Sequence, residues 1–130
     1  MVWGYAMAYK ILIADDSPLI RRALQWHIEQ NSECEVCGEA ENGQIAVEKV
    51  GQLNPDLVIL DLHMPVMNGL EAAKRISQTS LHTTMVLYTM QMSDQISRVA
   101  QAAGIKSVFL KSDSPSTGLL GWLKTIAATE

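Results

Sequence analysis

The sequence lacks any apolar run that approaches the roughly 20 residues needed to span a bilayer. It also lacks the charged start and long apolar region of a signal peptide. Basic residues are in the minority, with 10 Lys and Arg against 14 Asp and Glu. Nucleic acids and anionic membranes attract clustered Lys and Arg. We therefore expect a cytoplasmic protein that binds no membrane and touches DNA only through a separate domain.

Cysteine is also scarce, because the chain holds only Cys34 and Cys37. Their CxxC spacing occurs in zinc and redox sites, but the nearby sequence offers no second Cys or His pair to complete a tetrahedral zinc site. Residues 33–37 resemble a short strand, in which two positions three apart point to opposite faces. We expect two reduced thiols that pack in the core.

What the chain does contain is a regular alternation of short apolar runs and helical patterns. The 130 residues, 48% of them hydrophobic, are enough for one domain with its own core. Strands are predicted at 10–14, 34–40, 57–60, 84–89 and 106–110, and helices from 17 onward and at 44–52, 69–78, 93–103 and 116–128. Short strands without polar alternation require cover on both faces, which is typical of parallel sheets. We predict an α/β fold of five βα units, doubly wound.

Several residues mark the boundaries of these elements. Ser17 is expected to cap the first helix, with Pro18 in its first turn, and Gly104 to follow the end of the fourth helix. For the first helix, the predicted apolar stripe comprises Leu19, Ile20, Ala23, Leu24, Trp26 and Ile28. Trp122 in the last helix suits a core position and a partner interface equally well. Residues 1–8 are interpreted as an N-terminal extension, left from cloning or from a misplaced start, ahead of a domain at 9–130.

Reactive side chains follow four of the five predicted strands. They are Asp15, Asp16, Asp61, Thr89 and Lys111. The carboxyl ends of parallel strands are where such sheets bind ligands, and three carboxylates gathered there repel one another. Mg²⁺ suits them best, because it prefers oxygen ligands and is often shared with phosphate. The alternative is that the acidic pair merely favours the N-terminus of the next helix.

The other two groups point to phosphate chemistry. Lys111 offers a compact positive charge and Thr89 a hydroxyl donor, both suited to phosphoryl oxygens. A carboxylate beside a divalent cation and a lysine can act as a nucleophile toward phosphorus, which produces an aspartyl phosphate.

Taken together, four motifs resemble those of one known family. The motifs are Ile11-Leu12-Ile13-Ala14-Asp15-Asp16, Leu60-Asp61-Leu62-His63-Met64-Pro65 with Asn68-Gly69, Leu87-Tyr88-Thr89 and Leu110-Lys111. In this order they resemble the receiver domain of bacterial two-component response regulators, over about residues 9–128. Ser112-Asp113 after the lysine is similar to the NarL/FixJ-like branch. The resemblance implies a flavodoxin-like (CheY-like) (βα)5 fold with strand order 2-1-3-4-5.

The resemblance also implies roles for individual residues. Asp61 would accept a phosphoryl group from a sensor histidine kinase, and Lys111 and Thr89 would bind that group. The implied Mg²⁺ contacts are Asp16 directly, Asp15 through water, Asp61, and the main-chain carbonyl of His63. The protein would be a phosphoacceptor that catalyses its own phosphorylation and dephosphorylation, not a turnover enzyme.

The implied output is a switch read by a partner. Phosphorylation would alter the face formed by the fourth helix, fifth strand and fifth helix. That face would control an output domain or protein target, expected to regulate transcription, and homodimers could form on phosphorylation. Two departures stand out: Val108 occupies the position of the family's aromatic switch residue, with Phe109 next to it, and Met90 replaces a small residue after Thr89.

Two other classes of protein use some of the same residues. A haloacid-dehalogenase-like hydrolase also uses a nucleophilic Asp, Mg²⁺ and a lysine, but it needs a second Asp where this chain has His63, and it usually carries a cap domain. A phosphorylation-independent interaction module would not need the complete set of acids, threonine and lysine.

Overall fold

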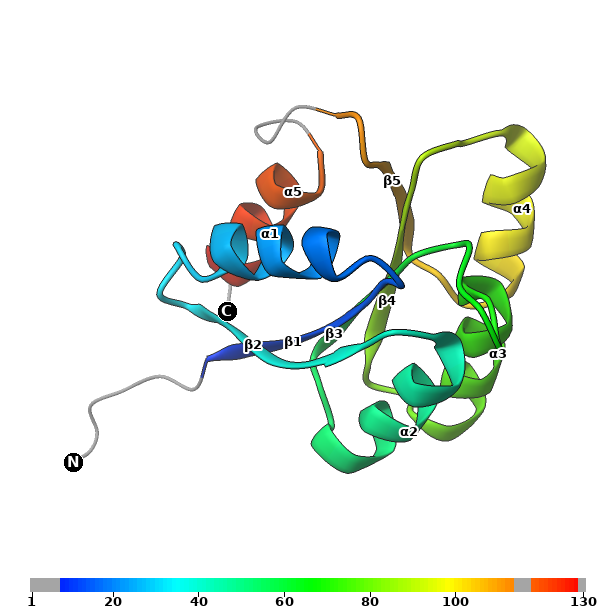
Figure 1. Cartoon of the computed structure of the whole chain (residues 1–130), viewed down its shortest axis with the longest axis horizontal. Coiled ribbons are helices and arrows are strands. Elements are labelled where there is room, and N and C mark those ends of the chain that lie inside the picture. Colours follow the sequence, from blue (N-terminus) through cyan, green and yellow to red (C-terminus); the bar gives the residue numbers. More distant parts are fainter. Residues whose placement is uncertain (1–7, 114–117, 129–130) are drawn as a thin grey trace.

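The structure, a computed structural model, describes residues 8–113 and 118–128 (Figure 1). Its elements are β1 (Tyr9–Ala14), α1 (Pro18–Ile28), β2 (Cys34–Ala40), α2 (Gly43–Leu53), β3 (Leu57–Leu60), α3 (Gly69–Thr79), β4 (Thr84–Thr89), α4 (Asp94–Ala102), β5 (Ser107–Leu110) and α5 (Leu119–Ala128). The strands form one sheet in the order β2-β1-β3-β4-β5, and each neighbouring pair is parallel. The predicted (βα)5 fold and its strand order are confirmed.

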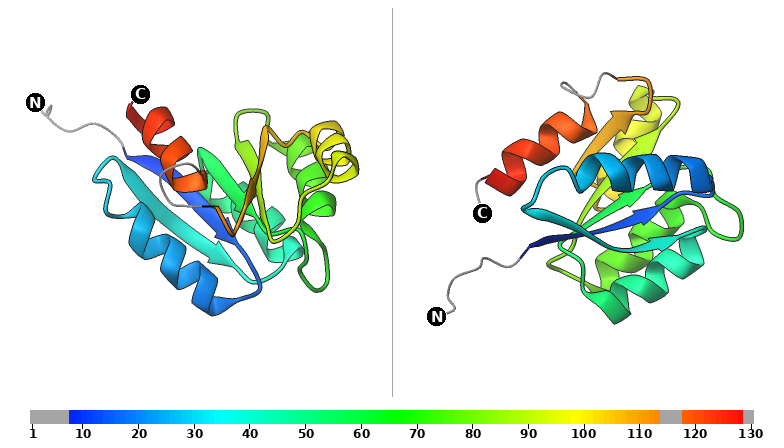
Figure 2. Two further views of the ribbon diagram at one scale, coloured as in Figure 1. Left: turned by 90° about the horizontal axis from the view of Figure 1, so that it is seen from above. Right: turned by 60° about the vertical axis from the view of Figure 1, so that its left-hand side comes forward.

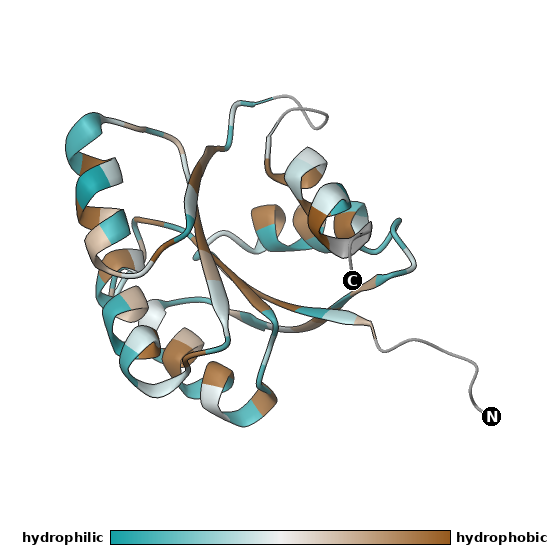
Figure 3. Ribbon diagram, turned by 180° about the vertical axis from the view of Figure 1, so that it is seen from behind, coloured by the Kyte–Doolittle hydropathy of each residue, from teal (hydrophilic) through white to brown (hydrophobic). Residues whose placement is uncertain are grey.

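Helices cover both faces of this sheet (Figures 1 and 2). Along β1, Leu12 and Ala14 belong to the core shared with α2, α3 and α4, whereas Ile11 and Ile13 belong to the core shared with α1 and α5. Successive strand residues point to opposite faces, so one strand supplies both cores. The apolar colouring of the strands in Figure 3 reflects this two-sided burial.

Burial is greatest at the centre of the sheet and weaker at its β5 edge. Every residue of β3 is at most 1% exposed, whereas all four residues of β5 are partly exposed. The prediction of strands buried on both faces therefore holds for the central strands. An edge strand lacks a neighbour on one side, which leaves β5 partly open.

The capping residues are as predicted. The Ser17 hydroxyl accepts a hydrogen bond from the Ile20 N–H at 3.3 Å, and Pro18 opens α1. Gly104 adopts φ +94° just after the C-cap of α4, a backbone conformation that glycine accepts at little cost. No helix among residues 8–113 and 118–128 is long and apolar enough to cross a membrane.

The predicted stripe of α1 is only half right. Leu24 and Ile28 are buried and Ile20 packs beside them, but Leu19 and Trp26 are 72% and 61% exposed. A helix lying on a sheet buries only one stripe of its surface. The second row of apolar residues therefore faces outward.

The α5 helix begins later than predicted. It starts at Leu119, after a bend at Gly118, while positions 116 and 117 lie outside the described residues. Trp122 is half-buried and packs against Phe109, with ring centroids 5.4 Å apart, so it contributes to the core.

The two cysteines behave as expected. Both are free thiols. Cys34 packs in the α1/α5 core and Cys37 against the opposite core. Burial raises the pKa of each thiol above its ordinary value, which favours the neutral, unreactive form.

Candidate functional site

The register of the sheet brings the predicted site residues to one edge. Ala14 of β1 aligns with Leu60 of β3, so the next residues, Asp15 and Asp61, leave neighbouring strands at the same level. The Asp61 N–H also donates to the Ala14 carbonyl at 2.8 Å. This juxtaposition comes from strand pairing, which places residues 46 positions apart side by side.

Three carboxylates meet at this edge. One side-chain oxygen from each of Asp15, Asp16 and Asp61 lies within 4.8 Å of the other two. Asp15 and Asp61 are only 2% and 7% exposed, whereas Asp16 is exposed. Hard oxygen donors grouped in this way suit a divalent cation such as Mg²⁺. We call these three residues the acid cluster.

Lys111 is the positive charge that faces the acid cluster. Its Nζ lies 2.7 Å from Asp15 Oδ2 and 3.3 Å from Asp61 Oδ1. Burial raises the pKa of the Asp61 carboxyl, and the Asp15 charge raises it further, while Lys111 opposes both effects. Burial would lower the pKa of Lys111, but its hydrogen bond and attraction to Asp15, and then its attraction to Asp61, leave that pKa above its ordinary value. The lysine therefore stays charged against a carboxyl that is costly to ionise.

Asp15 is bonded at each of its polar groups. Its N–H donates to the Ala40 carbonyl at 3.0 Å, and its carbonyl accepts from Arg21 Nη1 at 2.7 Å. Side-chain Oδ1 accepts from the Ser17 N–H at 2.9 Å, while Oδ2 accepts from Lys111. Sequence reasoning overlooked Arg21, because nothing in a run of two arginines indicates which one turns toward the loop.

The loop after Asp61 passes unusually close to that residue. A Cβ on Gly69 would lie 2.2 Å from the Asp61 carbonyl oxygen, so only glycine fits. Earlier in the loop, Val66 has φ +71°, and the Met67 N–H donates to the Pro65 carbonyl at 2.7 Å. This is a γ-turn, a rare and strained form of backbone. The loop thus folds back tightly beside Asp61.

Thr89 and His63, the other predicted site residues, differ in exposure. Thr89 is 1% exposed, and its carbonyl accepts from the Lys111 N–H at 2.8 Å. Its hydroxyl oxygen accepts from the Gln91 N–H at 3.5 Å. His63 is exposed on the loop after Asp61. Met90, which follows Thr89, is 68% exposed.

Strand alternation separates the two residues at the position of the aromatic switch. Val108 packs against the core on the α2, α3 and α4 side, whereas Phe109 packs in the α1/α5 core. Phe109 therefore cannot take the place of an aromatic side chain on the α4 side. Tyr88, which sequence reasoning passed over, has its ring centroid 5.8 Å from Lys111 Nζ.

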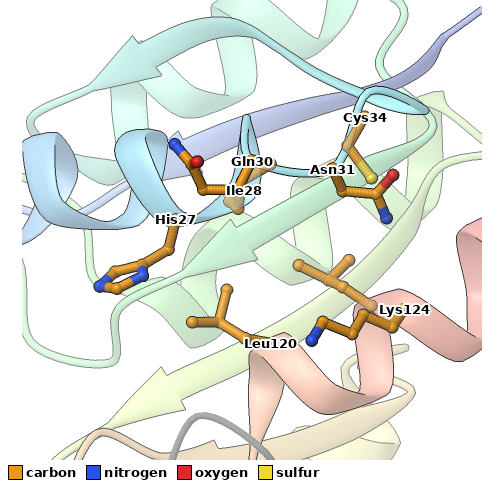
Figure 4. A pocket seen from close by; sticks show the side chains of 8 residues that line it. His27, Ile28, Gln30, Asn31, Cys34, Leu120 and Lys124 are labelled. Carbon is orange, nitrogen blue, oxygen red and sulfur yellow. The ribbon is translucent and has the colours of Figure 1, made fainter.

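A separate hollow of about 330 Å³ lies between α1 and α5 (Figure 4). Its lining includes Ile28 at the end of α1, Cys34 at the start of β2, and Lys124 on α5. These residues stand at the amino ends of the strands, opposite the edge that carries the acid cluster. The hollow is therefore distinct from the candidate site.

Comparison with known proteins agrees with this geometry. A family model described as the response regulator receiver domain matches residues 11–118. The transcriptional regulatory protein YdfI of Bacillus subtilis is 38% identical over 108 residues, which are 83% of this chain and 50% of YdfI. The nitrate/nitrite response regulator NarL of Escherichia coli is 35% identical over 120 residues, 92% of this chain and 55% of NarL. The chain thus spans about half the length of these curated relatives.

A solved structure gives the same answer for the fold. The LuxR-family two-component response regulator from Aurantimonas sp. SI85-9A1 superposes with a TM-score of 0.86 at 27% identity, covering 96% of this chain and 88% of that one. These findings do not favour a haloacid-dehalogenase-like hydrolase. The chain belongs to the response regulator receiver domain family of two-component systems, and its relatives place it in the NarL/FixJ-like branch.

Proposed function

We propose that Asp61 is the phosphoacceptor of this receiver domain. The observation that carries the proposal is the placement of Lys111 Nζ between two buried carboxylates, 2.7 Å from Asp15 and 3.3 Å from Asp61. A phosphohistidine of a sensor kinase is the expected donor. An Asp61 oxygen attacks phosphorus, the P–O bond forms, the P–N bond to the histidine breaks, and the imidazole leaves with the bonding electron pair.

The acid cluster is the proposed Mg²⁺ site. Its three carboxylates supply hard oxygens within 4.8 Å of one another, and their mutual repulsion favours a cation. Asp16 and Asp61 would bind the ion directly, Asp15 through water, and the main-chain carbonyl of His63 would complete the protein's contacts. When bound, Mg²⁺ neutralises charge on the phosphoryl oxygens.

Lys111 and Thr89 are proposed to hold the transferred group. The Lys111 ammonium already faces Asp61, so it is placed to pair with a phosphoryl oxygen there. The Thr89 hydroxyl can donate a hydrogen bond to another, because its present contact with the Gln91 N–H uses the oxygen as an acceptor. Both side chains are mounted at adjacent strand ends, and the Lys111 N–H is bonded to the Thr89 carbonyl.

The proposed consequence is a change on the face formed by α4, β5 and α5. Because the matched residues make up only 50% of YdfI and 55% of NarL, both regulators, we infer that the receiver controls transcription through an attached DNA-binding domain or a protein target. Homodimerisation on phosphorylation would couple the switch to that output. The protein itself serves as a phosphoacceptor with slow self-catalysed turnover.

Acetyl phosphate with Mg²⁺ provides the direct test. Intact mass spectrometry should show one phosphoryl increment that hydroxylamine removes, as expected of an acyl phosphate. The increment should be lost in Asp61→Asn and reduced in Asp16→Asn. Asp94→Asn, which alters an exposed acid on α4, is the matched control and should react like the wild type. An increment that persists in Asp61→Asn would contradict the assignment.

A further inference from the structure

Arg21 links three segments around the acid cluster. It projects from the first turns of α1, and its side chain is 17% exposed. Nη1 donates to the main-chain carbonyl of Asp15 at 2.7 Å, and Nε donates to Glu39 Oε1 at 2.8 Å. The guanidinium thus joins α1 to the loop after β1 and to β2.

The residue at the other end of this link, Glu39, has a side chain that is 40% exposed but a backbone that is held in place. Glu39 lies in β2 opposite Ile13 of β1, and its carbonyl accepts a hydrogen bond from Lys49 Nζ on α2. Arg21 therefore bonds to a side chain whose backbone is fixed by the sheet and by a neighbouring helix. The position of the Arg21 guanidinium is therefore set in part by the fixed backbone of Glu39.

The bond to the Asp15 carbonyl controls the peptide that leads into Asp16. The Asp15 carbonyl and the Asp16 N–H belong to one planar unit, so holding the oxygen fixes the plane from which Asp16 starts. Asp16 is exposed, and its direction depends on this backbone more than on packing. Asp15 is held in addition through its side chain by Ser17 and Lys111.

We propose that Arg21 is a positioning residue that orients Asp15 and Asp16 for cation binding and hence for phosphorylation. The inference rests on the proposed function of the acid cluster. A planar guanidinium can bond a carbonyl and a carboxylate at the same time through fixed donors, whereas a lysine ammonium is a single point charge. We therefore expect the planar, two-partner geometry of the Arg21 guanidinium, and not its charge alone, to orient the acid pair.

Charge and geometry predict opposite effects on Mg²⁺ affinity. Removing a positive charge near a cation site should strengthen cation binding if electrostatics alone matter. Losing the bond that orients the acid pair should weaken binding, and outer contacts of metal ligands typically contribute 10–100-fold in affinity. The direction of the change therefore separates the two explanations.

The experiment compares Arg21→Lys and Arg21→Met with Arg22→Met, which removes the same charge from the exposed neighbouring residue. Isothermal titration with Mg²⁺, without any phosphodonor, measures the dissociation constant. Both Arg21 variants should bind Mg²⁺ about tenfold or more weakly, and Arg22→Met should bind as tightly as the wild type or more so. Circular dichroism and urea unfolding verify that each variant is folded at the titration temperature.

Phosphorylation by acetyl phosphate supplies the second measurement. The Mg²⁺ concentration needed for half-maximal rate should rise in Arg21→Lys, while the rate at saturating Mg²⁺ stays near the wild-type value. Wild-type affinity in Arg21→Lys, or tighter binding in Arg21→Met, would overturn the positioning role. Failure of the wild type itself to bind Mg²⁺ or accept phosphate would instead overturn the proposed function. If an Arg21 variant does not fold, Glu39→Gln must weaken Mg²⁺ binding for the inference to stand.

Discussion

Replacing Asp61 by Asn is expected to make the protein more stable in the absence of Mg²⁺. The substitution removes one negative charge from the acid cluster but keeps the size of the side chain and an oxygen that can accept a hydrogen bond. Lys111 keeps its contact with Asp15 at 2.7 Å, so the change leaves it with a partner. The predicted gain comes from relieving charge repulsion inside a buried site.

The magnitude follows from the distances. The carboxylate oxygens lie within 4.8 Å of one another, so at an effective dielectric constant near 20 each pair repels by at least about 3.5 kcal/mol. Lys111, at 3.3 Å, attracts Asp61 by about 5 kcal/mol. Solvent screens part of the repulsion between Asp16 and Asp61, because Asp16 is exposed. Dehydration of Asp61, which is 7% exposed, adds a further cost. We expect a net gain in unfolding free energy of about 1–3 kcal/mol for Asp61→Asn at neutral pH.

The pH dependence has a definite sign. The pKa of Asp61 is raised in the folded protein, through burial first and then the charge of Asp15. The folded state therefore binds more protons than the unfolded state between the unfolded pKa, about 3.9, and the higher folded pKa. The contribution of Asp61 to wild-type stability therefore falls as pH rises through this window. The Asn variant lacks that fall, so the difference between the two proteins grows with pH and disappears below about pH 3.9.

Urea unfolding of both proteins in EDTA, from pH 3.5 to 7.5, measures this difference. Repeating the series with Mg²⁺ should stabilise the wild type more than Asp61→Asn, because a cation bound to the folded state stabilises it by mass action. An Asn variant that is equally or less stable than the wild type at pH 7 without Mg²⁺ would refute the account of Asp61 as a costly buried charge.

Three further predictions concern the surroundings of Asp61. Gly69→Ala places a Cβ 2.2 Å from the Asp61 carbonyl and should cost about 2–3 kcal/mol in urea unfolding; its control, Gly51→Ala, meets no atom within 4 Å and should stabilise by about 0.5–1 kcal/mol. Lys111→Met removes the counter-charge of the acid cluster and should cost about 3–5 kcal/mol without Mg²⁺; an unchanged urea midpoint would disprove this. Asn68→Ala breaks the capping box of α3 and should cost about 1 kcal/mol, with equal midpoints as the contrary result.

Much of the fold was predictable because its signals are local. The apolar run 57–60 marks β3 by its own composition, and Ser17 and Gly104 mark helix ends through bonds or backbone angles that involve only near neighbours. The predicted ends of the helices were less exact, as in α5, which begins at Leu119 instead of 116. Helix ends depend on cap geometry, which propensity alone locates only to within a few residues.

The predictions that failed or stayed open depend on which face of an element meets the sheet. Two adjacent apolar rows on α1 look equally suited to burial, yet only the row with Leu24 and Ile28 is inside, and Trp26 is outside. Val108 and Phe109 are neighbours in sequence, but strand alternation sends them to different cores. Orientation of this kind arises from packing of the whole domain.

The sequence by itself determined the order of elements, the acids and lysine at the strand ends, and the family. Each of these can be inferred from short stretches of sequence, because residue type and spacing within the stretch indicate the local structure or chemistry. The tertiary structure decided how those groups meet. Lys111 bonds to Asp15 across 96 positions, and Arg21 reaches back to the Asp15 carbonyl while bonding to Glu39 on β2. Contacts of that range exist only once the strands pair and the helices pack, because only then do distant residues share one edge of the sheet.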